Sequence, residues 1–188
     1  MMNNRKLALA TVLAALTAGS VQSAPVQWSA GVGGNDHWYE VVIGRPTTWN
    51  FANTSATAST HLGQTGYLAS ITSALEQTFL NGLNTSSIRA WLGGTDAAVE
   101  GTWEWTSGEA FTYSNWYTGE PNNYYNEDYL IGWWNGDTWN DYREVHVAAA
   151  YIVEYNPGVA PVPLPAGLPL VLGALGLLGF AGRRRKTS

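Results

Sequence analysis

Cysteine is absent from this chain of 188 residues. Disulfides, zinc–thiolate sites, iron–sulfur clusters and thiol nucleophiles are therefore excluded. Basic residues are also scarce, because the interval from Asp36 to Glu154 holds all 14 acidic residues but only Arg45, Arg89 and Arg143. So acidic a segment would repel the phosphates of nucleic acids, which we exclude as partners. Its clustered carboxylates instead favour divalent cations.

The two ends of the chain differ in composition from this acidic middle. Residues 1–23 have a basic start, an apolar stretch and then small residues, which predicts a secretory signal peptide before a folded domain at 24–155. Four prolines in residues 156–166 predict an extended linker. Residues 167–188 contain an unbroken apolar run followed by RRRK, which predicts a transmembrane segment with a cytoplasmic basic end.

Patterns of apolar and turn residues give the middle of the chain an α+β fold class. Aromatic and β-branched residues predict a strand at Trp38–Ile43. Residues 50–64 allow a weak helix, and a clearer helix follows Ser73, which forms a predicted capping box with Glu76. Short aromatic strands and loops fill the rest, so we expect an α+β domain with helices early and sheet late.

Residues 120–141 read EPNNYYNEDYLIGWWNGDTWND and combine carboxylates, amides and aromatic residues. Asn135-Gly136 is a strong hairpin signal. A two-residue turn there would pair positions whose numbers sum to 271, so that Leu130 faces Asp141. The residues just before the first strand, including Glu127, would then lie beside the end of the second strand.

Carboxylates that crowd together without cations repel one another or take up protons. A Ca²⁺ ion relieves this cost, since it takes about six to eight oxygen ligands from carboxylates, amides and water. The stretch has no histidine, which disfavours zinc and copper. A solvated acidic loop is the alternative interpretation.

The order of the segments WLGGTD, YSNW, EPN, ED and WND resembles the long-form C-type lectin-like domain, from about Trp38 to Tyr155. The resemblance implies that fold, with two early helices and mixed antiparallel sheets with a long calcium-binding loop region. It also implies a Ca²⁺ cofactor and a cis Glu120–Pro121 bond. It implies a principal Ca²⁺ site formed by Glu120, Asn122, Glu127, Asn140 and Asp141. It further implies an auxiliary Ca²⁺ site formed by Asp96, Glu100, Asn123 and Asp128.

The resemblance also implies carbohydrate binding, because in the family the principal ion holds two sugar hydroxyls directly. An EPN segment goes with mannose and N-acetylglucosamine-type sugars. Candidate sugar contacts are Glu120, Asn122, Glu127, Asn140, Tyr124 and Tyr125. The family's two usual disulfides are missing, and the spacings from EPN to ED and from ED to WND are altered. The alternative is therefore a calcium-stabilised protein-binding or extracellular-matrix module that binds no sugar.

The C-terminal order of VPLPA, an apolar run and RRRK resembles the PEP-CTERM sorting signals of Gram-negative bacteria. It implies processing by an exosortase-type peptidase, transient anchoring in the inner membrane, and delivery to the cell surface or an exopolysaccharide matrix. A plain single-pass anchor is the alternative. We expect no enzymatic activity, because Glu120 and Glu127 could not bind metal and also act as a glycosidase-like acid and base.

Overall fold

The computed structural model describes residues 21–158. Nearly all of the predicted signal peptide, most of the linker and the whole predicted C-terminal sorting segment lie outside these residues. Among the described residues, no helix is both long enough and apolar enough to cross a membrane.

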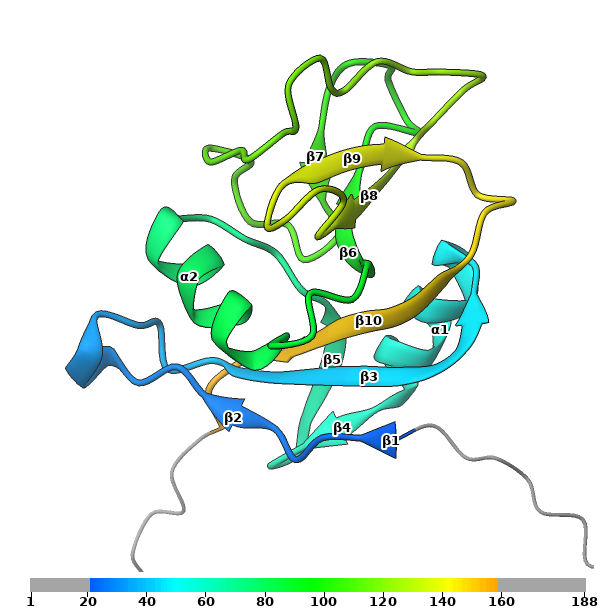
Figure 1. The fold of residues 1–188 in the computed structure, drawn as a ribbon. Helices are drawn as coiled ribbons and strands as arrows, with labels where there is room; N and C mark the ends of the chain where they lie inside the picture. Colours follow the sequence, from blue (N-terminus) through cyan, green and yellow to red (C-terminus); the bar gives the residue numbers. More distant parts are fainter. Residues whose placement is uncertain (1–20, 159–188) are drawn as a thin grey trace, which may run out of the picture. The chain divides into compact units, whose positions relative to one another are not determined.

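The described chain folds as an α+β domain with two α-helices and a large twisted sheet (Figure 1). This confirms the predicted fold class. In chain order its elements are β1 (Val21–Gln22), β2 (Val26–Gln27), the 3₁₀ turn η1 (Ala30–Val32), β3 (Trp38–Thr47), α1 (Trp49–Ala58), β4 (Thr60–His61), β5 (Gln64–Leu68), α2 (Ala74–Leu83), β6 (Ala90–Thr95), β7 (Glu104–Trp105), β8 (Tyr129–Gly132), β9 (Trp139–Tyr142) and β10 (Ala148–Tyr155).

The long strands β3 and β10 pair antiparallel at the centre of the sheet, with Tyr155 opposite Trp38. The main strand order is β1-β3-β10-β6-β8-β9, in which β10 and β6 run parallel. The first and last long strands therefore lie side by side (Figure 1). The hairpin β8–β9 stands at the other edge of the sheet, away from both.

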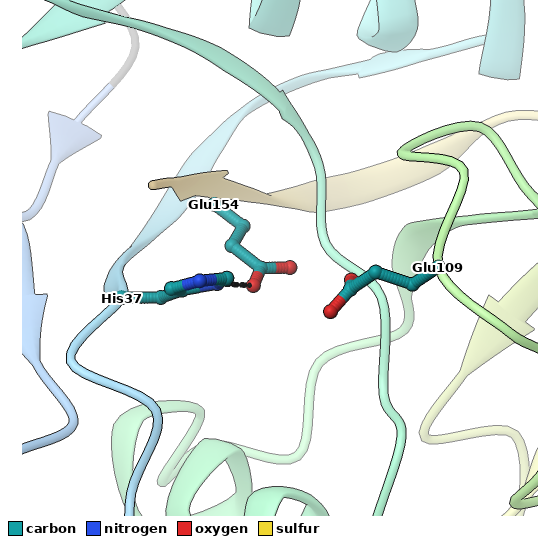
Figure 2. Close-up of side chains that lie close together, drawn as sticks. All are labelled: His37, Glu109 and Glu154. Carbon is teal, nitrogen blue, oxygen red and sulfur yellow. Dashed lines mark hydrogen bonds and ion pairs between the residues drawn. The ribbon is translucent and has the colours of Figure 1, made fainter. Parts of the chain in front are cut away.

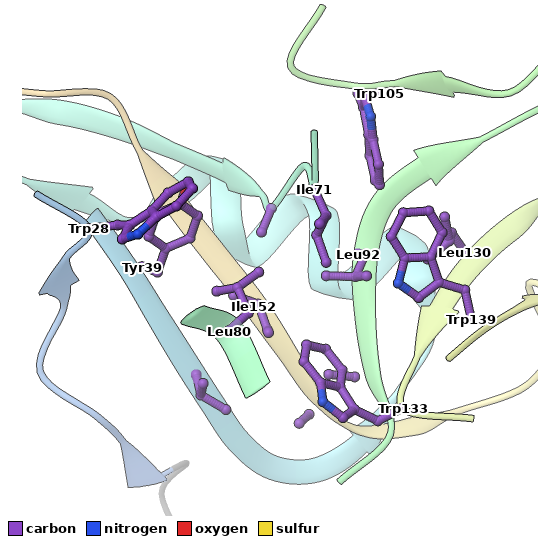
Figure 3. Packing of buried hydrophobic residues seen from close by; sticks show 14 residues of the cluster. Trp28, Tyr39, Ile71, Leu80, Leu92, Trp105, Leu130, Trp133, Trp139 and Ile152 are labelled. Atoms are coloured by element: carbon purple, nitrogen blue, oxygen red, sulfur yellow. The ribbon is translucent and has the colours of Figure 1, made fainter. Parts of the chain in front are cut away.

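Alternating side chains along β3 and β10 fill two hydrophobic clusters, one on each face of the sheet. Tyr39, Ile152 and Leu80 of α2 belong to the first cluster, which Figure 3 shows together with the buried tryptophans Trp28, Trp105, Trp133 and Trp139. Val42 and Val153 belong to the second cluster, which contains the buried face of α1. The two-residue period of a strand places neighbouring residues on opposite faces, so one strand pair supports both helices.

The two helices begin at the expected kinds of residue but differ from the predictions in detail. Ser73 caps α2 and accepts a hydrogen bond from the Glu76 backbone at 3.2 Å, as predicted. The predicted capping box is wrong in its second half, because Glu76 accepts from the backbone and hydroxyl of Thr72 instead of the Ser73 backbone. The weaker helix α1 ends at Ala58, since the following residues form the short hairpin β4–β5.

The hairpin β8–β9 has the predicted register, with Leu130 opposite Asp141 and Ile131 opposite Asn140. The predicted two-residue turn is wrong. Strand pairing stops at Gly132 and Trp139, and residues 133–138 form a longer loop closed by a bond from the Trp134 nitrogen to the Thr138 carbonyl. The loop of residues 133–138 is centred on the same two residues as the predicted turn, so the strand register is unchanged although the loop is longer.

Two glycines offer a matched test of sheet packing. A Cβ at Gly93 in β6 would lie 2.4 Å from the Leu68 carbonyl oxygen, whereas one at Gly82 in α2 would meet nothing within 4 Å. We expect Gly93→Ala to lower the free energy of unfolding by about 1–3 kcal/mol through overpacking. Gly82→Ala should raise it by up to about 1 kcal/mol, because alanine favours helix. Urea unfolding measures both, and equal effects would contradict this account.

Candidate functional site

Both ends of the loop that carries the EPN segment are attached to β9. At its start, Trp116 forms an isolated parallel bridge with Trp139, and the Tyr117 nitrogen donates to the Trp139 carbonyl at 2.8 Å. At its end, the loop runs into β8, which pairs with β9 along its length. Asn140 and Asp141 on β9 therefore lie where the two ends of this loop meet.

Hydrogen bonds within the loop draw the predicted ligands towards Asp141. The Asn123 backbone donates to Asp141 Oδ2 at 2.6 Å, and the Glu127 backbone donates to Asn123 Oδ1 at 2.8 Å. The Asn122 amide donates to Glu120 Oε2. The Glu120–Pro121 bond is cis, as the resemblance implied. The structure thus brings all five predicted principal ligands into one neighbourhood.

Two of these ligands have buried oxygen atoms without a partner. Asn140 and Asp141 are 3% and 1% exposed, and the Oδ1 atom of each accepts no hydrogen bond. Buried polar atoms are normally paired, because desolvating them without a partner costs about 1–3 kcal/mol. A divalent ion would satisfy both oxygens at once, so the residues present fit a metal.

The electrostatics of the neighbouring glutamates support the same conclusion. Burial, followed by the charge of Asp141, raises the pKa of Glu127 to about 7. Burial and the charge of Asp141 also raise the pKa of Glu120. Arg143 opposes the rise at Glu127 but does not cancel it. The three carboxyl groups therefore destabilise one another's charges and lack a sufficient positive partner.

The spacing of these carboxylates bears on which ion they suit. Among residues 21–158, one group of three side chains brings its ligand atoms within 4.8 Å of one another. That group is not Glu120, Glu127 and Asp141. Ligands on opposite sides of a Ca²⁺ ion lie about 5 Å apart, because each bond is about 2.3–2.6 Å long. At least one pair of these carboxylates is therefore too far apart for a small tetrahedral ion, whose ligand atoms lie about 3.3 Å apart.

The predicted auxiliary ligands form a second acidic group beside the first. Asp96 is 2% exposed, and its Oδ1 has no partner while its Oδ2 accepts from the Gly101 backbone at 2.9 Å. Burial, together with the charges of Glu100 and Asp128, raises the pKa of Asp96. Asn123 takes part in the bonds around Asp141 described above. The structure therefore places Asp96, Glu100 and Asp128 within electrostatic reach of one another.

The predicted sugar contacts Tyr124 and Tyr125 lie on the surface of this loop. Their exposed fractions are 64% and 70%, and their rings meet edge to face with centroids 4.3 Å apart. Asn123, Tyr125 and Asn126 have positive φ angles of 50°, 58° and 68°. Non-glycine residues rarely adopt this region, and such backbone conformations concentrate at functional loops.

Sequence reasoning missed one convergent group altogether. His37, Glu109 and Glu154 each offer a ligand atom, and these atoms lie within 4.8 Å of one another. His37 and Glu154 are 117 positions apart in the sequence. No local motif contains them, so only the pairing of β3 with β10 could have revealed this group.

The sequence of this domain matches a known protein family. Residues 47–146 match the model of the lectin C-type domain, which covers more than half of the chain. The chain belongs to the C-type lectin domain family.

Individual relatives agree with that assignment. The chain is 36% identical over 107 residues, 53% of its length, to the alpha-N-acetylgalactosamine-specific lectin of Patiria pectinifera. It is 45% identical over 72 residues, 36% of its length, to the mannose-binding protein of Gallus gallus. The matched parts cover 63% and 28% of these two relatives. Among solved structures, herring type II antifreeze protein aligns with a TM-score of 0.55 and 27% identity, over 63% of this chain and 89% of its own.

The raised pKa of Glu127 predicts how the stability of the metal-free protein depends on pH. That pKa rises from 4.5 to about 7 on folding, so the folded chain binds this proton more tightly than the unfolded chain. The stabilisation is fully present below the unfolded pKa and is lost as the pH rises towards 7. In EDTA, we expect the Tm to fall between about pH 5 and pH 7.5. Thermal unfolding followed by tryptophan fluorescence measures it.

Glu127→Gln should flatten this fall, whereas Glu104→Gln, which changes an exposed carboxylate on β7, should leave it unchanged. Adding CaCl₂ at the higher pH should restore the Tm of the unmodified protein, because a bound cation replaces the proton. Identical pH profiles for the unmodified protein and Glu127→Gln would contradict the attribution of this pH dependence to Glu127.

Proposed function

We propose that this protein is a calcium-dependent carbohydrate-binding module. The observation that carries the proposal is the pair of buried, unpartnered oxygens on Asn140 and Asp141, together with the bond that ties Asp141 to the loop holding Glu120, Asn122 and Glu127. Family membership supports it, since one relative named above is a lectin by name and another is a mannose-binding protein.

In this proposal, one Ca²⁺ ion is held by Glu120, Asn122, Glu127, Asn140 and Asp141. The ion supplies two coordination positions for neighbouring hydroxyls of a sugar. The carboxylate oxygens accept hydrogen bonds from those hydroxyls, and the Asn122 and Asn140 amides donate to them. The Asn122 amide donates to Glu120 Oε2, an oxygen that the ion would take up. Calcium would release this amide for a ligand, so sugar binding would require the metal.

The EPN segment favours mannose or N-acetylglucosamine-type sugars. The exposed rings of Tyr124 and Tyr125 would extend the contact by packing against a pyranose face. The auxiliary group of Asp96, Glu100, Asn123 and Asp128 would hold a second Ca²⁺ ion that stiffens the same loop. These roles are supported by the position of Tyr124, Tyr125 and Asn123 on the loop that carries the EPN segment and by the bond from the Asp96 nitrogen to the Asp128 carbonyl.

We place this module outside the cytoplasm, consistent with the predicted signal peptide and the predicted sorting segment. An exosortase-type peptidase would process the tail, and an exopolysaccharide of the cell surface would be the natural glycan partner. We propose no catalytic role, because the candidate acids are needed as metal ligands.

Exchanging the ligand amide and carboxylate tests sugar recognition at the site. The double substitution Glu120→Gln with Asn122→Asp retains the oxygen ligands but reverses which side chain donates and which accepts. We expect it to change the ratio of mannose to galactose affinity by at least about tenfold, equivalent to about 1.4 kcal/mol. Isothermal titration in CaCl₂ measures both affinities. Glu104→Gln is the matched surface control and should leave the ratio unchanged.

Two further results would contradict the proposal. One is sugar binding that persists undiminished in EDTA. The other is the absence of any Ca²⁺ binding at millimolar concentration, since every proposed contact depends on the ion.

A calcium-stabilised protein-binding or matrix module is the second candidate. It is favoured by the altered spacing between the EPN, ED and WND segments and by the similarity to an antifreeze protein. In that case, Ca²⁺ would still raise the Tm, but the double substitution would leave the affinity for a protein partner nearly unchanged. A glycan array probed in CaCl₂ separates the two candidates, because only the first predicts retained glycans.

A further inference from the structure

His37, Glu109 and Glu154 converge from three separate segments of the domain (Figure 2). His37 immediately precedes β3, Glu154 lies in β10, and Glu109 lies in the loop after β7. His37 Nδ1 is 2.5 Å from Glu154 Oε1, and the carboxylate of Glu109 approaches from the opposite side. Glu154 is fully buried, whereas His37 and Glu109 are partly open to solvent.

The group is short of positive charge. Among the described residues, the His37–Glu154 contact is the one ion pair within 4.0 Å. Glu76 adds a third carboxylate nearby, bonded to the Tyr39 hydroxyl at 2.5 Å. Burial raises the pKa of Glu154 to about 7 despite the hydrogen bond from His37. One imidazole thus faces several carboxylates, and buried carboxylates without full compensation are costly.

The surrounding hydrogen bonds leave Glu154 Oε1 available to a new partner. The Tyr39 hydroxyl has one hydrogen, and the nearer acceptor is Glu76 Oε1 at 2.5 Å, compared with 3.0 Å for Glu154 Oε1. The other oxygen of Glu154 accepts from the Ser70 backbone at 2.9 Å. The shortest contact of Oε1 is therefore the one with His37 Nδ1 at 2.5 Å.

Glu109 also has one carboxylate oxygen, Oε1, that is available to a new partner. Its Oε2 accepts from the Ser107 hydroxyl at 3.2 Å, and that hydroxyl also lies 2.7 Å from the Ser70 hydroxyl. Among the described residues, no hydrogen bond is found at its Oε1. These contacts hold Glu109 beside Glu154 while leaving one of its oxygens free.

We infer that His37, Glu109 and Glu154 bind a transition-metal ion of the Zn²⁺ type, separate from the calcium loop. The ion would replace the proton between His37 Nδ1 and Glu154 Oε1, and water would complete a four-coordinate shell. In such a shell, neighbouring ligand atoms lie about 3.3 Å apart, given zinc bonds of about 2.0–2.2 Å. The 2.5 Å contact must therefore open by less than an ångström, and Glu109 can follow on its loop.

The ligand chemistry distinguishes this group from the calcium loop. An imidazole nitrogen with two carboxylates suits zinc, whereas calcium takes about six to eight oxygens. Glu76 cannot readily add ligands, because its oxygens are engaged by Tyr39 and by Thr72. His37 and Glu154 also lie outside residues 47–146, which match the family model. The inference is thus independent of the proposed lectin function.

An ion here would crosslink three segments. It would join the chain before β3, the loop after β7 and the central strand β10. A chain without cysteine has no disulfide to make such a connection. Metal binding to the folded form alone would raise the Tm.

Metal titration of the full-length protein, prepared without a histidine tag, tests the inference. The protein is stripped with EDTA, returned to buffer with millimolar CaCl₂ to fill calcium sites, and titrated with CoCl₂ and then ZnCl₂. We expect one equivalent of Co²⁺ to give the visible absorption of a four-coordinate ion, and Zn²⁺ to displace it. His37→Gln and Glu109→Gln should each weaken binding at least about tenfold, the lower end of the loss seen when even outer ligands are changed.

His146→Gln is the matched control, because it removes a histidine that contacts Tyr142 far from this group in the fold. Its Co²⁺ and Zn²⁺ affinities should equal those of the unmodified protein. Glu109→Gln is the variant least expected to misfold, because Glu109 is partly exposed. The near-ultraviolet circular dichroism spectrum of this variant should match that of the unmodified protein. No binding by the unmodified protein, equal binding by His37→Gln, or displacement of Co²⁺ by Ca²⁺ alone would each overturn the inference.

Discussion

The scarcity of positive charge inside the domain is the constraint on which the rest of the structure depends. Arg89 lies over the ring of Trp134, and Arg143 lies near Tyr125, so neither pairs directly with a buried carboxylate. Yet the fold buries Glu127, Asp141 and several other acids. Buried charges of one sign raise one another's pKa values and favour protonation or cation binding. A domain built in this way must exchange protons or metal ions with its surroundings.

The sheet brings these acids together, because each acidic group lies where distant strands meet. The β8–β9 register places Asp141 opposite Leu130, and the loop that starts at Trp116 returns to the same strand through Trp139. The Trp139 ring is fully buried and donates to Gln77 at 2.7 Å, which fixes β9 against α2. Packing of apolar residues therefore positions the polar ligands that follow Trp139 in the chain.

The sequence predicted much of the fold because its strongest signals are local. Ser73 marks the start of α2, and the Asn135-Gly136 pair marked a hairpin whose register the structure confirms. The longer turn was not predicted, because the positive φ of 58° at Trp133 depends on packing. The candidate ligands of the principal calcium site could be named because they lie within residues 120–141, in short segments that resemble those of a known family. The His37–Glu154 contact could not, because its two residues meet only through pairing of the first and last long strands.

The absence of cysteine and the surplus of carboxylates both affect how the longest loop of the domain is stabilised. Residues 106–128 contain no helix or strand, and closing so long a segment costs conformational entropy that must be offset by interactions at its ends and along its length. Aromatic packing supplies part of this, as Trp103, Phe111 and Trp116 show. The remaining polar part of the segment donates a backbone hydrogen bond to Asp141, whose buried Oδ1 has no partner. A reversible ionic connection there would stiffen the segment only when cations are abundant, whereas a disulfide would hold it permanently. The loop is therefore suited to coupling its rigidity, and any binding it supports, to the ionic composition of its surroundings.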